Sequence, residues 1–334
     1  PVLELIKQAA EDPNVLAIKQ TLYRTGKDSP IVEHLVQAAR NGKDVTVVVE
    51  LRARFDEEAN LGLADRLQEA GVQVVYGVVG FKTHAKMLLV VRREGRKLRR
   101  YVHLGTGNYH SGTARAYTDI GLVTADPDIG NDVHLIFQQL SGLAPATSLS
   151  RLLQAPFTLH AGILARIERE AEHARNGRPG RIIAKMNALN EPQVMRALYA
   201  ASQAGVSIDL IVRGACSLRP GVPGVSDNIR VRSIVGRFLE HHRVYWFGND
   251  GQPELYCASA DWLERNLLRR VETCFPILDP ALAARVKREA LDNYLADNLN
   301  AWELHADGVY RKVVPADGDP PHSAQSALLA GICG

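Results

Sequence analysis

The sequence predicts an α/β protein of two tandem domains, each with a mixed, largely parallel sheet and helices on both faces. Three observations lead to this fold class. Amphipathic helical patterns alternate with short apolar strand patterns. The same order returns after residue 150, and in each half one strand ends on a run of small residues. An internal duplication with a pseudo-two-fold relation between the halves is the simplest explanation.

The first half opens with helical patterns at 2–10, 31–40 and 59–70, and Asn41-Gly42 closes the second of them. The strand patterns between and after them are VLAIKQTLY (15–23), DVTVVVEL (44–51), VQVVYGV (72–78) and KMLLVVRR (86–93). This βαβαβ order implies a largely parallel sheet. Such sheets bind ligands at the carboxyl ends of their strands. The basic run GRKLRR at 95–100 predicts a hairpin connection.

The second half repeats this order. Its helical patterns lie at 159–176 and 193–203, and its strand patterns are RIIAKMNAL (181–189) and VSIDLIVRG (206–214). We align the halves by three anchors, which pair 18–20 with 184–186, 48–50 with 210–212, and His84 with His241. The small-residue strand ends then correspond, GTGN at 105–108 with ASAD at 258–261. A residue that acts in one half therefore predicts a counterpart in the other.

We place the first domain at 1–150 and the second at 151–314, because a helical pattern at 132–142 and the loose stretch LAPATSLS end the first repeat. Residues 315–334 are rich in Pro, Ala, Gly and Ser, and we expect a flexible C-terminal tail there. The chain starts without Met and without a basic-then-apolar leader. We therefore expect a fragment that is not secreted in this form.

Composition narrows the class of protein. Hydrophobic residues make up 46% and charged residues 23%, and no apolar run approaches the roughly 20 residues of a membrane span, which predicts a soluble globular protein. A net charge of +3 is too small to indicate a nucleic-acid binder. Four cysteines form no CxxC pair and show no ligand spacing with histidine, so we expect a reduced cytoplasm and no zinc. Arginines gather in two clusters, at 92–100 and 230–243.

A nucleophile is suggested by the tripeptide His84-Ala85-Lys86, which opens an apolar strand. Strand alternation puts His84 and Lys86 on one face. A neutral imidazole can attack phosphorus and later leave, while Lys86 would neutralise phosphate oxygens. His241 and Arg243 repeat this pair in the second half, where Arg243 would bind phosphate with an arginine fork in place of the lysine point charge.

Two histidines suit a double displacement, in which one attacks phosphorus and the other exchanges protons with the leaving and accepting oxygens. The turn at 105–108 would let backbone N–H groups approach the phosphate, and Asn108 could donate to its oxygens. An ordinary tight turn is the alternative interpretation. Taken alone, a single histidine at the start of a strand is more often structural, and the duplication is what favours chemistry.

HxK followed by GTGN, and HxR followed by ASAD, look like the duplicated motif of the phospholipase D superfamily. The likeness to the polyphosphate kinase family is closer. It rests on segments that extend through residues 1 to about 310: IKQTLYRTGKDSPIV, ELRARFDEEAN, GFKTHAKMLLVVRR, YVHLGTGNYH, TARAYTDIGL, AKMNAL and ADWLERNLLRRVE. The resemblance implies two tandem phospholipase-D-like domains.

It also implies residue roles. The histidine of KTHAKM is phosphorylated in the family, which designates His84, and that of LEHxR assists, which designates His241 rather than His242. The remaining matches are Arg24 and Arg54, associated with bound Mg²⁺ and phosphates, and Tyr117, Arg213 and His241, which contact the nucleotide. Because a guanidinium has no lone pair to give to a metal, we interpret Arg24 and Arg54 as phosphate clamps.

The implied activity is reversible transfer of the ATP γ-phosphate to inorganic polyphosphate, with Mg²⁺, through a phosphohistidine. The implied partners are ATP or ADP and polyphosphate, with no nucleic acid. The family also implies a cytoplasmic homo-oligomer, a dimer or tetramer, with peripheral membrane attachment as a further option. Two alternatives stay open. One is a phospholipase-D-like phosphodiesterase or nuclease, disfavoured because Val91 and Gly248 stand where those enzymes carry Asp. The other is a polyanion-binding module without catalysis.

Overall fold

The computed structural model describes residues 1–23, 29–50, 57–78, 80–143 and 148–333, and only the backbone for 57–61 and 332–333. The chain forms two compact units. Unit 1 comprises residues 1–115, 119–157 and 269–273, and unit 2 comprises 116–118, 158–268 and 274–334. A short segment of each repeat thus clusters with the other unit. The boundaries predicted at 150 and 314 stay predictions.

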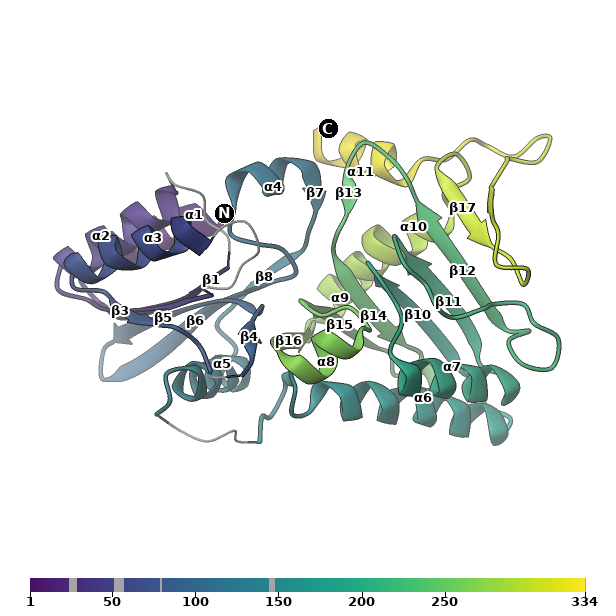
Figure 1. Cartoon of the computed structure of the whole chain (residues 1–334), viewed down its shortest axis with the longest axis horizontal. Coiled ribbons are helices and arrows are strands. Elements are labelled where there is room, and N and C mark those ends of the chain that lie inside the picture. Colours follow the sequence, from purple (N-terminus) through teal and green to yellow (C-terminus); the bar gives the residue numbers. More distant parts are fainter. Residues whose placement is uncertain (24–28, 51–56, 79, 144–147, 334) are drawn as a thin grey trace. The chain divides into compact units, whose positions relative to one another are not determined.

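Unit 1 is built on a six-stranded sheet with the order β3-β2-β1-β5-β6-β8. Its strands are β1 (Val15–Leu22), β2 (Asp44–Val49), β3 (Gln73–Val75), β5 (Lys86–Glu94), β6 (Lys97–Gly105) and β8 (Gly121–Thr124). Helices α1 (Val2–Glu11), α2 (Pro30–Arg40) and α3 (Glu57–Glu69) lie on one face of the sheet, and α5 (Pro127–Leu140) lies on the other (Figure 1). The short elements β4 (Lys82–Thr83), α4 (Ser111–Ala116) and β9 (Leu153–Ala155) complete it.

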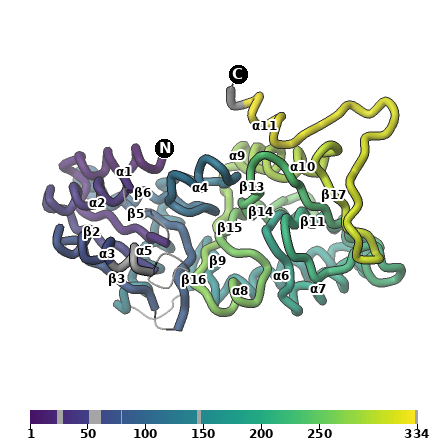
Figure 2. Tube along the Cα trace, turned by 45° about the horizontal axis from the view of Figure 1, so that its top comes forward, coloured from purple at the N-terminus to yellow at the C-terminus, as the bar shows by residue number. Residues whose placement is uncertain are grey.

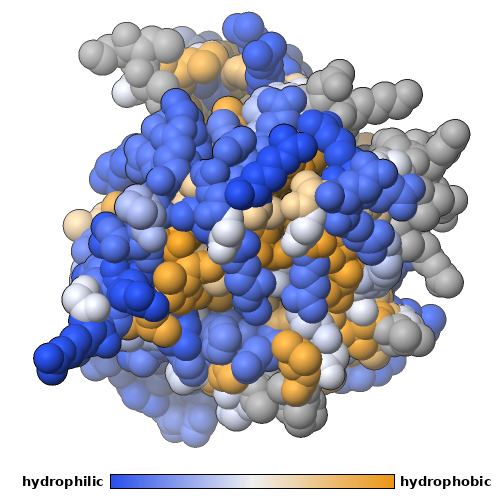
Figure 3. All heavy atoms as spheres, turned by 90° about the vertical axis from the view of Figure 1, so that its left-hand side faces the viewer, coloured by the Kyte–Doolittle hydropathy of each residue, from blue (hydrophilic) through white to orange (hydrophobic). Residues whose placement is uncertain are grey.

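The core of unit 1 lies between the sheet and helices α1 to α3. Buried side chains of β1 and β2, such as Ile18, Leu22 and Val47, pack there against Ile6 and Leu35 of the helices. β-branched residues favour the pleated strands, and burying each aliphatic side chain contributes about 1.5–3 kcal/mol. On the side of unit 1 seen in Figure 3, hydrophilic side chains cover most of the surface and apolar ones show in narrow strips between them.

Unit 2 carries the second sheet, in the order β18-β17-β12-β11-β10-β14-β15-β16. Its strands are β10 (Arg181–Met186), β11 (Ser207–Val212), β12 (Ile229–Ile234), β14 (Arg243–Phe247), β15 (Glu254–Ala258), β16 (Arg270–Pro276), β17 (Ala301–Leu304) and β18 (Tyr310–Lys312). Residues 270–273 of β16 cluster with unit 1. Helices α6 (Leu159–Arg175) and α7 (Pro192–Gln203) run side by side on one face of the sheet, as Figure 2 shows.

The other helices of unit 2 are α8 (Glu264–Arg269), α9 (Pro280–Lys287), α10 (Asn293–Leu295) and α11 (Ala324–Cys333), with helical turns at Asn249–Gly251 and Arg288–Asp292. The turn at Arg288–Asp292 packs on β10 from the face opposite α6 and α7. Strand β13 (Leu239–Glu240) pairs in parallel with β7 (Tyr117–Thr118), which belongs to unit 2 although in sequence it lies between two segments of unit 1.

Acidic caps followed by proline start three of the helices. Asp126 accepts hydrogen bonds from Asp128 N (3.0 Å) and Ile129 N (2.9 Å) at α5. Glu191 and Asp279 cap α7 and α9 in the same way, and a proline follows each cap. A carboxylate at the N-cap satisfies free N–H groups, and proline at the first position fixes the helical φ.

Both sheets are mixed, but antiparallel neighbours outnumber parallel ones, whereas the sequence predicted a largely parallel sheet. In the described part of the chain, β3-β2-β1 in unit 1 and β12-β11-β10 in unit 2 form the parallel runs of three strands. The strands β5-β6-β8 and β14-β15-β16 continue them in antiparallel order. The helices between the early strands allow parallel crossovers, while the later strands are joined by hairpins such as Glu94–Lys97.

The shared strand order supports duplication, but the ladders correct two of the three anchors. With Lys86 aligned to Arg243, the partners of β5 and β14 match 20–22 with 184–186, not 18–20. The parallel ladders likewise match 47–49 with 210–212, not 48–50. Runs of similar apolar residues can be aligned in more than one register from sequence, whereas the hydrogen-bonded partners of a strand fix a single register. The match of His84 to His241 and of 105–108 to 258–261 agrees with this register.

Residues 315–334 differ from the expected tail, because helix α11 occupies Ala324–Cys333. The buried carboxylate of Asp297 accepts a hydrogen bond from Ala324 N at 2.8 Å, which anchors the start of the helix. Flexibility of this segment stays a prediction. Among the described residues, no helix combines the length and apolar character that crossing a membrane requires.

Candidate active site

His84 lies between β4 and β5 in unit 1. The N–H groups of His84 and Ala85 both donate to Val271 O, at 2.9 and 3.0 Å. Thr21 Oγ1 donates to Ala85 O at 2.7 Å from the neighbouring strand. The backbone under the imidazole is therefore held from two sides, by β1 and by the segment 269–273.

The imidazole of His84 is oriented by a carboxylate. His84 Nδ1 lies 2.9 Å from Glu272 Oε2, and the two side chains are 11% and 0% exposed. An ionised carboxylate can only accept, so Nδ1 carries the proton and Nε2 keeps its lone pair. The ring of Tyr23 meets the imidazole edge to face at 4.9 Å between centroids. This arrangement presents Nε2 as the nucleophilic atom.

Burial dominates the protonation of His84. It lowers the pKa of the imidazole to about 4; the Glu272 carboxylate opposes this shift, and Lys86 and Arg270 add to it. His84 is therefore neutral at physiological pH, the form in which an imidazole attacks phosphorus. Arg270 NH1 lies 4.0 Å from Glu272 Oε1, so the buried carboxylate faces both a histidine and a guanidinium.

Lys86 begins β5 two residues after His84, and both side chains lie against the ring of Tyr23. Lys86 is 1% exposed, and its Nζ donates to His84 O at 2.5 Å and lies 5.4 Å from the centroid of the Tyr23 ring. The ammonium is thus fixed beside the histidine backbone. A cation held there adds to the positive potential around the nucleophile.

The GTGN turn is shaped by Asp119. Thr106 Oγ1 donates to Asp119 Oδ1 at 2.7 Å, and a Cβ placed on Gly107 would come within 2.0 Å of Asp119 Oδ2. Gly107 is therefore needed to make room for this carboxylate, a reason that differs from the predicted approach of a phosphate. Asn108 Oδ1 is buried and has no hydrogen-bond partner among the described residues.

His241 lies between β13 and β14 in unit 2. Its backbone N donates to Thr118 Oγ1 at 3.1 Å, and the centroids of its ring and the Tyr117 ring lie 5.1 Å apart. Tyr117 and Thr118 are the two residues of β7. Asn187 Nδ2 donates to His241 O at 3.3 Å. The structure thus brings together Tyr117 and His241, which the resemblance had assigned to one nucleotide site.

Arg243 forms a buried ion pair. Its Nε and NH2 each lie 3.1 Å from an oxygen of Asp261, and Arg243 is 4% exposed. Its NH1 donates to His241 O at 2.8 Å. Burial alone would raise the pKa of Asp261, but the Arg243 guanidinium and the Asn187 N–H together outweigh it and hold the pKa below its ordinary value.

Arg213 directly follows β11, and its NH1 donates to Glu240 O, the residue before His241, at 2.9 Å. Burial lowers the pKa of Arg213 from its ordinary value, and Asp261 opposes that shift. A guanidinium stays charged with any such shift. Arg213 therefore supplies a cation beside the strand that leads to His241.

The strand registers pair the two sets of residues. Lys86 is opposite Gly105 as Arg243 is opposite Ala258, which matches Asn108 with Asp261. Gly121 is opposite Gly105 as Cys274 is opposite Ala258, which matches Asp119 with Glu272. Each repeat therefore holds a histidine, a cation, an Asn or Asp, and a further carboxylate at corresponding positions.

Of the predicted site residues, His84, Lys86 and Asn108 lie in unit 1, and Tyr117, Arg213, His241 and Arg243 lie in unit 2. Arg24 and Arg54 lie outside the described residues. Sequence reasoning missed Glu272 and Asp119 as functional candidates. Their correspondence rests on the ladders that match Gly121 with Cys274, so the sequence alone carried no signal for them.

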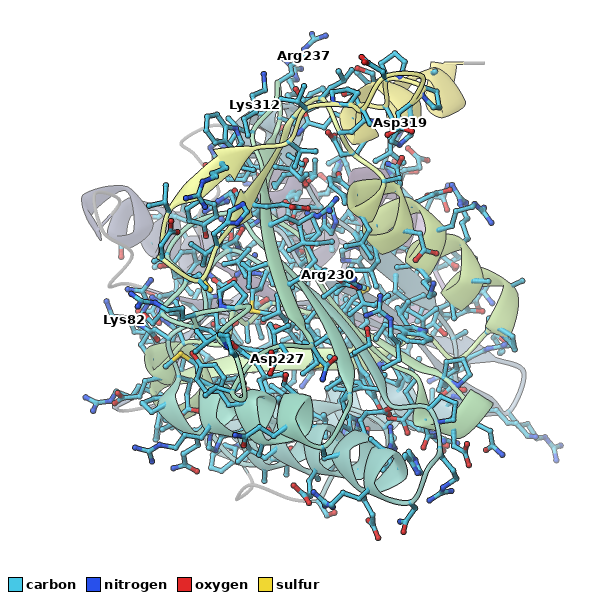
Figure 4. All side chains as sticks on the ribbon, turned by 90° about the vertical axis from the view of Figure 1, so that its right-hand side faces the viewer. Lys82, Asp227, Arg230, Arg237, Lys312 and Asp319 are labelled. Carbon is cyan, nitrogen blue, oxygen red and sulfur yellow. The ribbon has the colours of Figure 1, made fainter. Side chains whose placement is uncertain are left out.

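The second arginine cluster is dispersed rather than continuous. Arg230 pairs with Asp209 and Arg232 with Glu303, each at 2.7 Å, while Arg243 pairs with Asp261. Arg237 projects outward at the edge of unit 2 (Figure 4). Within the described ranges, no three His, Cys, Asp or Glu side chains gather as metal ligands.

Comparisons with known proteins match both halves. The family model described as "Polyphosphate kinase C-terminal domain 1" matches residues 1–146, and "Polyphosphate kinase C-terminal domain 2" matches 152–325. The chain is 77% identical to a polyphosphate kinase of Xylella fastidiosa over 331 residues, covering 99% of this chain and 47% of the relative. It is 61% identical to one of Pseudomonas aeruginosa, covering 98% and 48%. The chain thus spans about half the length of these curated relatives.

Two solved structures are similar to this chain in fold. The crystal structure of polyphosphate kinase from Porphyromonas gingivalis matches with a TM-score of 0.92 and 40% identity, covering 100% of this chain and 51% of that one. A phosphatidylserine synthase from Haemophilus influenzae matches with a TM-score of 0.60 and 12% identity, covering 99% and 91%. The second likeness shows the fold alone.

Proposed function

The chain belongs to the polyphosphate kinase family, and we propose that it carries the phosphoryl-transfer chemistry of such an enzyme, moving phosphate between ATP and inorganic polyphosphate. The observation that supports this most directly is the contact of His84 Nδ1 with Glu272, which leaves Nε2 as a neutral, oriented nucleophile. Identity of 40% to a solved polyphosphate kinase over the whole chain supports the same activity.

The proposed reaction has two displacements. His84 Nε2 bonds to the γ-phosphorus of ATP while the bond from that phosphorus to the β,γ-bridging oxygen breaks, and ADP leaves. A terminal oxygen of polyphosphate then attacks the same phosphorus and Nε2 leaves, so the polymer gains one phosphate and the histidine is neutral again. The reverse sequence makes ATP. Glu272 stabilises the positive charge that develops on the imidazole ring in the first step.

Other residues have supporting roles in this proposal. Lys86 and Asn108 assist phosphate binding, and His241 exchanges protons with the leaving and accepting oxygens. Tyr117, Arg213 and His241 contact the nucleotide, and Arg24 and Arg54 clamp phosphates, with Mg²⁺ carried by the substrate. Arg243 was predicted to bind phosphate; its fork onto Asp261 favours a role in holding His241 instead.

Phosphodiester hydrolysis is less favoured. Gly248 stands where phospholipase-D-type enzymes carry an Asp, and a Cβ there would lie 3.2 Å from Arg181 Cβ and 3.4 Å from Arg181 O. The position is closely packed against β10 and has little room for a carboxylate.

A cytoplasmic location, peripheral membrane attachment and assembly into dimers or tetramers belong to this proposal as expectations for the whole protein.

The test is to incubate the full-length protein with Mg²⁺ and γ-labelled ATP, and in parallel with labelled polyphosphate, and to map acid-labile phosphate. We expect label on His84, lost in His84→Ala and retained in His305→Ala, which changes an exposed histidine of unit 2. A folded protein that takes no acid-labile label from either donor would overturn the phosphohistidine. Turnover of an aryl phosphodiester would favour the phosphodiesterase, and salt-dependent polyphosphate binding without label would favour a binding module.

A further inference from the structure

Helix α11 contributes one buried polar side chain, Gln325, to the segment that precedes His241. Gln325 is 5% exposed. Its Oε1 accepts a hydrogen bond from Phe238 N at 2.9 Å, and its Nε2 donates to Phe238 O at 2.9 Å and to Glu240 Oε1 at 2.5 Å. The amide thus pairs with the backbone of Phe238 through a donor and an acceptor, as a neighbouring strand would.

The segment 238–240 is held by hydrogen bonds on two sides. Leu239 and Glu240 pair with Tyr117 and Thr118 of β7, while Gln325 satisfies Phe238 and the Glu240 carboxylate. Strand β13 has two residues and would be weakly held by β7 alone. The amide of Gln325 therefore supplies the hydrogen bonds that a second flanking strand would have supplied.

Glu240 connects this amide to the histidine. Its Oε2 lies 2.6 Å from Lys185 Nζ and accepts from Thr118 Oγ1 at 3.1 Å, and Glu240 is 3% exposed. Thr118 Oγ1 in turn accepts from His241 N at 3.1 Å. Gln325 thus reaches the backbone of His241 through two side chains, the buried carboxylate of Glu240 and the half-buried hydroxyl of Thr118.

We propose that Gln325 of the C-terminal helix is a positioning residue for His241, fixing the 238–241 segment so that the His241 ring keeps its place against Tyr117. The inference rests on the proposed function for the role of His241, and on contacts within unit 2 for the positioning. Hydrogen bonds to an ionised carboxylate are stronger than those between neutral groups. In a buried network, removing one member can cost more stability than its single hydrogen bond contributes.

Gly236 supports this role, because a Cβ at that position would lie 2.5 Å from Gln325 Oε1. The residue is exposed and its φ is not in the left-handed region, so alanine fits its backbone. The closest atom belongs to the flexible end of Gln325. Gly236→Ala should therefore push the amide away from Phe238 without disturbing the core of unit 2.

The test compares Gln325→Leu, Gly236→Ala and the control Ser326→Ala, an exposed neighbour on the same helix, in the full-length protein. We expect both test variants to lower kcat about tenfold, the effect of roughly 1.4 kcal/mol on a barrier, with KM for ATP changed less than about twofold. The control should match the wild type. A lost helix contact without positioning would lower thermal stability and leave the kcat of the folded fraction unchanged.

A second measurement is independent of activity. The imidazole C–H resonances of His241, assigned with His241→Asn, should shift or broaden in both test variants and stay in place in Ser326→Ala. If the wild type proves inactive, the proposed function fails and these resonances still decide the positioning. If Gln325→Leu does not fold, Gly236→Ala decides. Folded test variants with wild-type kcat and unmoved His241 resonances would overturn the inference.

Discussion

The imidazole of His84 and the carboxylate of Glu272 lie 2.9 Å apart, although 188 positions separate them in the chain. Glu272 belongs to the segment 269–273 of the second repeat that clusters with unit 1. The carboxylate fixes both the ring and its tautomer, as second-sphere acids do for many functional histidines. The nucleophile proposed in one repeat therefore depends on an acid supplied by the other.

Replacing this acid with its amide tests the dependence. We expect Glu272→Gln to slow labelling of His84 by ATP at least about tenfold, equivalent to about 1.4 kcal/mol of barrier, because the amide NH₂ group can donate to Nδ1 and favour the tautomer whose proton sits on Nε2. Single-turnover labelling measures this rate. Glu69→Gln, at an exposed position of α3, is the matched control. An unchanged rate in folded Glu272→Gln would show that the contact does not orient the nucleophile.

The pH dependence of labelling reports the protonation of His84. Burial lowers its pKa to about 4, so the imidazole gains its proton, and loses its nucleophilic lone pair, only as the pH falls toward that value. We expect the acid limb of the labelling rate to bend near pH 4, below the value of about 6.5 for an ordinary histidine. In Glu272→Gln the bend should move lower still, because the carboxylate raises this pKa. A bend near 6.5 in the wild type would contradict the buried, neutral nucleophile.

Periodicity and turn residues predicted the early helices and strands of both repeats, because each element's pattern is local. The same local information identified His84 and His241, since both open apolar strands. Glu272 could not be found this way, because its role comes from the tertiary placement of 269–273. The repeat register failed for a related reason: β1 and β10 both contain a lysine among apolar residues, and aligning Lys19 with Lys185 is attractive, yet the ladders match Lys185 with Thr21.

Gly107 provides a test of the turn in unit 1. We expect Gly107→Ala to destabilise the protein by about 1–3 kcal/mol, the usual cost of overpacking, because the new methyl group would collide with Asp119 and break its contact with Thr106. Gly62→Ala in α3 is the matched control; no atom lies within 4 Å of its added Cβ, and it should gain about 0.5–1 kcal/mol of helix stability. Urea unfolding measures both. Equal stabilities would mean that Asp119 moves aside without cost.

The buried pair of Arg243 and Asp261 makes the strongest prediction, because the first repeat has Lys86 and Asn108 at the matched positions. Asp261→Asn leaves a guanidinium that is 4% exposed without its carboxylate, and we expect a loss of about 3–5 kcal/mol. The double variant Arg243→Lys with Asp261→Asn recreates the Lys86 and Asn108 combination at the matched positions. An ammonium can then donate to His241 O, as Lys86 donates to His84 O, so the double variant should recover at least half of the loss. A double-mutant cycle by urea unfolding measures the coupling. Additive losses would show that the two repeats, despite their common register, do not support their histidines in interchangeable ways.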